Sequence, residues 1–377
     1  MKVSVVGAGI IGLSAAWALQ RNGHQVTVYE QGEIPNSLGS SVDQHRLIRF
    51  PYGDELGYTH MVSNAYQAWE QLWEDIGTSL YVQTGTLVLA GSSSNEDWAY
   101  SSARTLEKLG FLVDWLDRDR LKYNFPLFSF DSGERGFYLN SGGVLLAQPI
   151  IEKLSQYLTH QGVVLHPNSP IDEVDTTCAQ IVLANKKVVD ADILIIAAGP
   201  WVRRLLPAFY ERVIPSRQVI VYIEPPAFLA SRWTTAPMVL DVAPFNNFYL
   251  VPSVMGTQIK IGSNSFSMSG EPDYERLPSE SEAIATYKLC QHRLKDFQEY
   301  SLIDAKTCFY SVAPEKHFIV ESIGSSWILS GFSGHGFKFG PLLGLALADA
   351  IADRFNKDEL NRWAAGYQLT ENINIKV

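Results

Sequence analysis

The sequence predicts an α/β fold, α+β over the whole chain, with one domain built on a parallel sheet and a second on an antiparallel sheet. Three observations predict this arrangement. The chain opens with an apolar strand, a glycine turn and a helix, and it closes with the same succession of elements. Between them, residues 216–263 contain short segments of alternating polarity, which are typical of antiparallel strands.

Size and composition agree with a two-domain globular protein. The chain has 377 residues, of which 46% are hydrophobic and 19% are charged. Its formal net charge of -10 argues against nucleic acid as a partner, because an acidic surface repels phosphate backbones. The three cysteines, Cys178, Cys290 and Cys308, lie far apart and form no metal-binding spacing. We therefore expect no metal site and a reducing, cytoplasmic location.

The first nineteen residues resemble a signal peptide in hydrophobicity but not in pattern. Three glycines interrupt the apolar run, and no convincing small-residue cleavage site follows it. No later run of about 18 apolar residues predicts a membrane span. A strand, a turn and a helix describe this segment better.

Gly7, Gly9 and Gly12 form the pattern G-x-G-x-x-G between a strand over 3–6 and a helix over 13–21. The first glycine permits the tight turn, the second lets the backbone approach a pyrophosphate, and the third lets helix and strand pack closely. Glu30 ends the next strand, where a carboxylate can accept hydrogen bonds from ribose hydroxyls. The segment predicts a Rossmann-like dinucleotide site, but it does not distinguish NAD from FAD.

The rest of the chain alternates predicted helices and strands. Met61, Ala65, Ala68 and Leu72 recur at helical spacing within residues 58–76. Further helices are predicted over 98–109, 148–161 and 281–294, and from residue 341. Strands are predicted over 81–89, 163–165, 181–184, 188–190, 192–199 and 327–330. We infer a discontinuous nucleotide domain over 1–85, 142–215 and 305–377, interrupted by a substrate domain over 86–141 and 216–304.

Three separated motifs carry a resemblance to a known family. They are residues 331–339 (GFSGHGFKF), residues 308–321 (CFYSVAPEKHFIVE), and RLIR at 46–49 followed by Tyr52 and Gly53. Together they resemble the sarcosine oxidase and N-methyl amino acid oxidase branch of the D-amino-acid oxidase superfamily. The resemblance covers essentially the whole chain in the same order. It implies FAD as the cofactor and an FAD-binding domain of the glutathione-reductase type.

The turn over 331–339 makes physical sense as a flavin site. Gly331, Gly334 and Gly336 expose backbone N–H groups ahead of a helix opened by Pro341. The positive end of that helix would stabilise the anion of a reduced flavin. Without the resemblance, a glycine turn before a core helix explains the pattern equally well. Further cofactor contacts are expected from Ile10, Ile11, Ser40, Ser41, Arg46, Ile171, Gly199, Trp201, His335, Phe337 and Lys338.

Cys308 matches the family's cysteine that bonds through sulfur to the flavin 8-methyl carbon. The attacking species is a thiolate, so the resemblance implies a locally positive site. A buried cysteine that acts as a small hydrophobic residue is the alternative. The resemblance thus predicts FAD held covalently by Cys308.

The resemblance also implies the substrate side. Arg49 and Lys338 match the family's two ligands of the substrate carboxylate, for which a guanidinium is well shaped. Lys260 matches the lysine at which oxygen reacts with reduced flavin. The alternatives are a surface salt bridge for Arg49 and a solvent-facing strand position for Lys260. Arg46 and His335 match residues beside the flavin, and Tyr249 and Tyr310 match pocket tyrosines.

The implied activity is oxidation of the C–N bond of a small secondary or N-methylated amino acid, such as sarcosine or a cyclic imino acid. Hydride would pass to flavin N5, the imine would hydrolyse, and oxygen would give hydrogen peroxide, in a monomeric enzyme. The chain departs from the family's sarcosine oxidases at Ser41, Val42 and Asn264, where they carry histidines. These departures leave the substrate open.

Four other functions remain as alternatives. They are a dehydrogenase that passes electrons to a quinone, an oxidase of a primary amino acid such as glycine, a flavin hydroxylase, and a flavoprotein without enzymatic activity. The hydroxylase lacks support because its usual Gly-Asp phosphate motif is replaced by the sequence from Gly331 to Gly334. A non-enzymatic protein would leave Arg49, Lys260 and Lys338 unexplained.

Overall fold

The computed structural model describes residues 1–90, 97–242 and 247–368. Its first layer is a six-stranded sheet in the order β19-β20-β13-β1-β2-β9, in which only the edge strand β19 is antiparallel to its neighbour. Strands from near both ends of the described chain therefore belong to one sheet. The strands are β1 (Lys2–Val6), β2 (Gln25–Tyr29), β9 (Val164–His166), β13 (Ile193–Ile196), β19 (Ile319–Ile323) and β20 (Ser326–Ser330).

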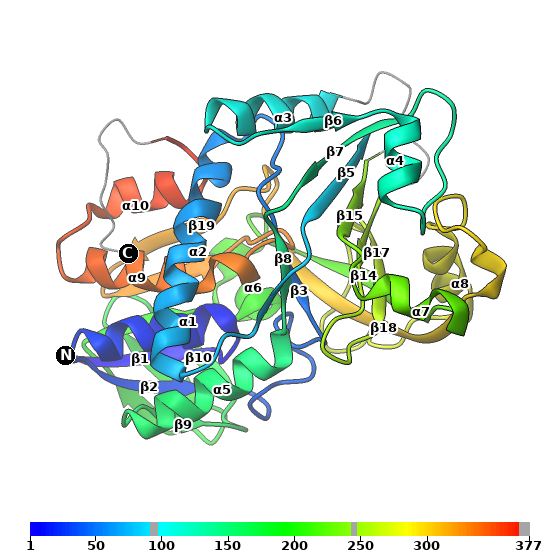
Figure 1. Ribbon diagram of the computed structural model, residues 1–377. Helices are drawn as coiled ribbons and strands as arrows, with labels where there is room; N and C mark the ends of the chain where they lie inside the picture. The colour runs from blue at the N-terminus through cyan, green and yellow to red at the C-terminus, as the bar shows by residue number, and fades with distance from the viewer. Residues whose placement is uncertain (91–96, 243–246, 369–377) are drawn as a thin grey trace.

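Four helices gather beside this sheet: α1 (Ile10–Arg21), α2 (Leu56–Ile76), α5 (Ala147–His160) and α9 (Gly340–Ile351) (Figure 1). Helices α1 and α9 pack closely because the contact uses small residues. A Cβ atom on Gly344 would lie 2.4 Å from the backbone oxygen of Ser14, and one on Gly340 would lie 2.7 Å from Ile10 Cγ1. This packing sets the glycine turns that precede α1 and α9 beside each other.

A small antiparallel sheet packs against the parallel one. Ile181 and Leu183 share a buried cluster with Leu194, Ile196 and Ile328 of the parallel sheet. The strands of the small sheet are β10 (Ile171–Asp175), β11 (Gln180–Leu183) and β12 (Val188–Asp190). A short helix, α6 (Val202–Leu205), follows β13.

The second half of the molecule is an eight-stranded sheet in the order β18-β14-β17-β16-β15-β5-β7-β6 (Figure 1). All pairs are antiparallel except β15 with β5. The strands are β5 (Thr86–Ala90), β6 (Asp114–Leu116), β7 (Arg135–Leu139), β14 (Ile214–Glu224), β15 (Met238–Asp241), β16 (Phe248–Val251), β17 (Ile259–Ser263) and β18 (Ser301–Val312). The remaining helices are α3 (Asp97–Lys108), α4 (Arg118–Asn124), α7 (Ala227–Trp233), α8 (Glu280–Lys288) and α10 (Lys357–Ala364).

The predicted α/β fold is confirmed, with local corrections. The strand expected over 81–89 is two strands, β4 (Tyr81–Gln83) and β5, because the chain turns at Gly85 with φ of +72°. Strand β4 joins β3 (Arg46–Ile48) and β8 (Gly143–Leu145) in a third sheet. The helix expected over 281–294 ends at Lys288. The elements that were not predicted include α4, α6, α7, α10, β3, β6, β10, β18 and β19.

Strand β18 runs without a break across residue 305, at which the last segment of the nucleotide domain was expected to begin. The limits of the two domains stay a prediction. Among the described residues, no helix combines the length and the hydropathy that crossing a bilayer requires.

Candidate active site

The first glycine turn is fixed by contacts that admit no side chain. Gly7 has φ of +103°, and a Cβ atom there would lie 2.4 Å from the backbone oxygen of Ala197. A Cβ atom on Gly12 would lie 1.9 Å from the backbone oxygen of Gly7. Gly9 sits at the N-terminus of α1, where the N–H of Ile10 donates to Ser41 Oγ at 2.9 Å. The turn therefore leads into the positive end of α1, as the sequence predicts.

Glu30 lies beside this turn and is buried. Its carboxylate accepts hydrogen bonds from the N–H of Ala8 at 2.8 Å, from Asn36 Nδ2 at 2.8 Å and from the N–H of Gly32 at 3.2 Å. Three donors hold both oxygens in place, and a carboxylate has about four acceptor positions. One position thus remains for a ribose hydroxyl.

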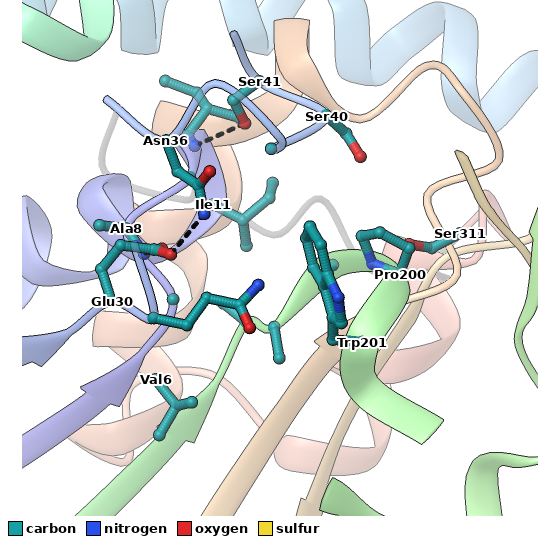
Figure 2. Close-up of a pocket in the computed structure, with 18 of the residues that line it drawn as sticks. Val6, Ala8, Ile11, Glu30, Asn36, Ser40, Ser41, Pro200, Trp201 and Ser311 are labelled. Atoms are coloured by element: carbon teal, nitrogen blue, oxygen red, sulfur yellow. Dashed lines mark hydrogen bonds between the residues drawn. The ribbon is translucent and has the colours of Figure 1, made fainter. Parts of the chain in front are cut away.

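A cavity of about 480 Å³ joins the first glycine turn to the second. Its volume lies within the usual range of ligand sites. In Figure 2, Glu30, which follows β2, and Ser41, in the loop before β3, lie on one side of the cavity, and Trp201 and Ser311 lie on the other. Fifteen of the predicted site residues line it: Gly7, Gly9, Ile10, Ile11, Glu30, Ser40, Ser41, Arg46, Ile171, Gly199, Trp201, Tyr310, Gly334, Gly336 and Phe337.

The second glycine turn packs against strand β18. Gly334 has φ of +78°, and a Cβ atom there would lie 2.6 Å from the ring of Tyr310. The N–H of Ser333 donates to the backbone oxygen of Ser311 at 2.8 Å. The turn then passes into a short 3-10 helix, Phe337–Phe339, and into α9. Residues of both glycine turns thus line the same cavity.

The remaining predicted residues lie outside the lining of this cavity. Gly12 packs against the backbone of Gly7, and Gly331, with φ of +68°, packs against Ala313 and Ile319. The other six are Arg49, Tyr249, Lys260, Cys308, His335 and Lys338. They lie at or beside the two buried lysines and Cys308.

Lys260 is only 2% exposed, so the alternative of a solvent-facing strand residue is wrong. Its ammonium donates to Asp43 Oδ2 at 2.8 Å and to the backbone oxygen of His45 at 2.6 Å. Asp43 also pairs with Arg46 and accepts a hydrogen bond from the hydroxyl of Tyr222. The lysine is thus held in a buried ion cluster by a carboxylate 217 positions away in sequence.

The charges in this cluster determine its protonation. Burial lowers the pKa of Lys260 to about 8, against the opposing effect of Asp43. Burial alone would raise the pKa of Asp43, but Lys260 and Arg46 outweigh burial and hold that pKa well below its usual range. Burial lowers the pKa of His45 to about 3, so its ring is neutral at pH 7. The cluster at neutral pH consists of one anion and two cations.

Lys338 is 4% exposed and has different neighbours. Its Nζ donates to Tyr52 Oη at 2.6 Å and to the backbone oxygen of His335 at 3.0 Å. The guanidinium carbon of Arg49 lies 4.7 Å from the centre of the same tyrosine ring, and Tyr52 Oη lies 3.0 Å from His335 Nδ1. In the described part of the chain, no carboxylate lies within 4.0 Å of either cation. Arg49 therefore forms no surface salt bridge there.

Burial lowers the pKa of Lys338 well below its usual range, and the charge of Arg49 lowers it further. Burial likewise lowers the pKa of Arg49. Two cations held together without an anion are costly to bury. The arrangement is suited to receiving an anionic ligand, and a carboxylate is the anion that a guanidinium binds with two hydrogen bonds.

Cys308 lies on β18, opposite Gln218 of β14. Burial raises the pKa of its thiol, and the charge of Asp43 adds to that effect, whereas the charges of Arg46, Lys260 and Arg276 act against it without outweighing burial. Three cations and one anion thus lie around the thiol, so the surrounding charge is positive, as a thiolate would require. Tyr249 and Tyr310 interact through their hydroxyls, and burial raises the pKa of both.

The sequence did not reveal several residues that organise these clusters: Asp43, His45, Tyr52, Tyr222 and Asn36. Asp43 precedes Arg46 by three positions, which is a weak signal for an ion pair, but nothing in the sequence connects it to Lys260. Tyr52 belongs to a motif that carried the family resemblance, without a role of its own. The contacts of Asp43, His45, Tyr52 and Tyr222 come from folding, because they join segments distant in sequence, whereas Asn36 contacts Glu30 only six residues away.

The chain matches a family model described as FAD dependent oxidoreductase over residues 2–350. The chain belongs to this family. Mouse peroxisomal sarcosine oxidase is 31% identical, covering 91% of this chain and 90% of its own length. Monomeric sarcosine oxidase from Bacillus sp. (strain B-0618) is 24% identical over 92% and 90%, respectively. These relatives confirm the expected branch.

Solved structures share the fold. L-proline dehydrogenase from P. horikoshii superposes with a TM-score of 0.83 at 19% identity, covering 97% of this chain and 96% of that one. Membership makes the chain an FAD-dependent oxidoreductase. The residues present fit FAD: two glycine turns without room for a Cβ atom face one cavity, and Glu30 has an acceptor position left for ribose.

Proposed function

We propose that this enzyme oxidises the C–N bond of a small secondary or N-methylated amino acid, or of a cyclic imino acid, with O2 as electron acceptor. One observation carries the proposal: the half-buried Arg49 and the buried Lys338 lie around Tyr52 without a carboxylate within 4.0 Å among the described residues. A carboxylate-bearing substrate would supply the missing anion. The names of the sarcosine oxidase relatives support an N-methylated amine beside that carboxylate.

The residues of the large cavity would hold FAD. The N-terminus of α1 would face the pyrophosphate, Glu30 the ribose, and the backbone of Ile171 the adenine. Gly334 and Gly336 would meet the flavin end, ahead of α9. FAD held there would supply the two-electron redox chemistry: it would take up the hydride from the C–H bond next to the amine nitrogen, so that the C–N bond becomes an imine, and would deliver the two electrons to O2 as hydrogen peroxide.

The side chains have separate tasks in this proposal. Arg49 and Lys338 bind the substrate carboxylate and so fix which carbon faces the cofactor. The charge of Lys260 stabilises the negative charge that develops on oxygen as it is reduced. Arg46 places a further positive charge beside Cys308 and lines the cofactor cavity. The aromatic walls of Tyr249 and Tyr310 exclude water from the reacting amine.

A dehydrogenase is the second candidate, and one observation favours it. Asp43 pairs with Lys260 at 2.8 Å, which weakens the positive field that an oxygen reaction would use. Such an enzyme would pass electrons to a quinone or another carrier.

The test is a substrate panel assayed with two acceptors. Sarcosine, N-methyl-L-alanine, L-proline and glycine are each supplied under air and, separately, under nitrogen with a redox dye. We expect peroxide from at least one secondary amine and little from glycine. Turnover with dye but not oxygen would establish the dehydrogenase, and preference for glycine would establish a primary amino acid oxidase. Flavin that no member of the panel reduces would contradict the proposal.

We also propose that Cys308 holds FAD covalently. The positive surroundings of its thiol support this, because Arg46, Lys260 and Arg276 all favour the thiolate. Acid precipitation is expected to leave the yellow colour in the protein pellet. Cys308→Ser should release the colour to the supernatant, whereas Cys178→Ser, at an exposed site, should not. Colour in the wild-type supernatant would contradict the link.

The predicted domain limits, a monomeric state and a cytoplasmic location complete the proposal. The name of the Bacillus relative supports a monomer.

A further inference from the structure

Lys338 has two hydrogen-bond acceptors, neither of them a carboxylate, which is as many as a neutral amine can use. Its Nζ has two acceptors, Tyr52 Oη at 2.6 Å and the backbone oxygen of His335 at 3.0 Å. The tyrosine hydroxyl lies 3.0 Å from His335 Nδ1, to which it can donate its own proton. A neutral amine has two N–H donors and one lone pair. Both donors are thus used, and the lone pair remains.

The electrostatic surroundings also favour the neutral form. Arg49 shares Tyr52 with Lys338, and the described residues around the pair contribute no nearby carboxylate. The titratable groups that face Lys338 are Arg49 and Tyr52 after β3, His335 on its own turn and Tyr58 of α2, with His317, Glu55 and Glu315 beyond them. His335 is neutral because burial lowers its pKa well below the usual range, and Glu55 and Glu315 are exposed and screened by solvent.

We infer that Lys338 is a neutral amine in the free enzyme and that it removes the proton from the ammonium group of the incoming amino acid. This inference rests on the proposed function. The N–H bond of the substrate breaks, its electron pair stays on the substrate nitrogen, and the lone pair of Lys338 forms the new N–H bond. Nothing is oxidised or reduced in this step, and no proton is exchanged with water.

The substrate drives this transfer itself. Its carboxylate arrives between Arg49 and Lys338 and supplies the missing anion, which raises the proton affinity of the lysine. The amine loses its proton at the same time and gains the lone pair that oxidation of its C–N bond requires. Lys338 would thus act first as a base and then as the charged partner of the carboxylate.

Proton uptake on ligand binding tests the inference without turnover. Methoxyacetate has the size and carboxylate of sarcosine, but an ether oxygen replaces the amine, so it has no proton to give. We expect its binding to the anaerobic holoenzyme at pH 7 to remove about one proton per flavin from a weakly buffered dye solution. N,N-dimethylglycine, which has an ammonium proton, should bind with little net exchange.

Two variants test whether Lys338 is the group that takes up the proton. Lys338→Arg keeps a permanent cation at the site, so methoxyacetate should still shift the flavin spectrum but take up no proton. Lys260→Met removes the other buried lysine and should leave the uptake near one. Binding of methoxyacetate to the wild type without uptake would overturn the inference. No spectral shift with either ligand would overturn the proposed carboxylate site, and with it this inference.

Discussion

Lys260 and Lys338 are the same residue type at nearly the same burial, yet their surroundings are opposite. Lys260, on β17, has a carboxylate 2.8 Å away and lies in a complete ion cluster. Lys338, on the turn before α9, has a phenol 2.6 Å away and a guanidinium as its neighbour. The two elements belong to opposite halves of the molecule (Figure 1). Burial lowers the pKa of both lysines, and their neighbours account for the difference: Asp43 opposes the shift at Lys260, whereas Arg49 adds to it at Lys338.

The difference corresponds to two uses of a buried amine. The protein supplies the counter-ion of Lys260, so its charge is present before any ligand arrives. A ligand must supply the counter-ion of Lys338, so its charge appears only in the complex. A site completed by its ligand costs stability in the free protein, which is a common cost of function.

Removal of Asp43, the counter-ion of Lys260 and Arg46, should lower stability strongly. Asp43→Asn leaves Lys260 and Arg46 buried without an anion, so the free energy of unfolding should fall by about 3–5 kcal/mol. Urea unfolding monitored by fluorescence measures this change. Asp54→Asn, at an exposed position nearby, is the matched control and should change stability by less than about 0.5 kcal/mol. Equal effects of the two variants would show that the ion cluster contributes no stability.

The two lysines should differ in the sign of their truncation effects. Lys260→Met leaves Asp43 with Arg46 alone and should destabilise the fold by about 3 kcal/mol. Lys338→Met replaces an amine that lacks a counter-ion by an apolar chain of similar length, so stability should stay within about 1 kcal/mol or rise. The same urea experiment compares both. A large loss in Lys338→Met would mean that its counter-ion is present in the free protein.

The pH dependence of the free energy of unfolding tests the lowered pKa of Lys260. The pKa of Lys260 is about 8 in the folded protein and about 10.4 in an unfolded chain. Between these values the unfolded chain binds more protons, so this lysine makes stability rise with pH across that window. Its facing groups, Asp43, Arg46, His45 and Cys308, remain in Lys260→Met.

The free energy of unfolding of the wild type should therefore rise relative to that of Lys260→Met from pH 8 to pH 10. A difference that is constant over this range would show that Lys260 is not perturbed in the folded state.

The sequence predicted the parts of the site that depend on local geometry. The glycines at 7, 9 and 12 and at 334 and 336 mark backbone positions where a side chain does not fit, and such positions are visible in a motif. The family resemblance also pointed to Arg49, Lys260 and Lys338, whose functional roles stay a prediction. The sequence could not predict their partners, because Asp43 meets Lys260 only when the loop before β3 packs on the antiparallel sheet. The split of 81–89 at Gly85 was missed because the residues on both sides of the glycine are typical of strands.

In the proposed mechanism Lys338 acts on the amine and Lys260 acts on oxygen. Stopped-flow measurement of the two half-reactions separates these roles. Flavin reduction by substrate is followed without oxygen, and reoxidation of the reduced enzyme is followed on mixing with oxygen. We expect Lys338→Met to slow reduction by about 10² or more and to leave reoxidation within a few-fold. Lys260→Met should slow reoxidation by about 10²–10³ and spare reduction. Equal slowing of both half-reactions by either variant would contradict the account.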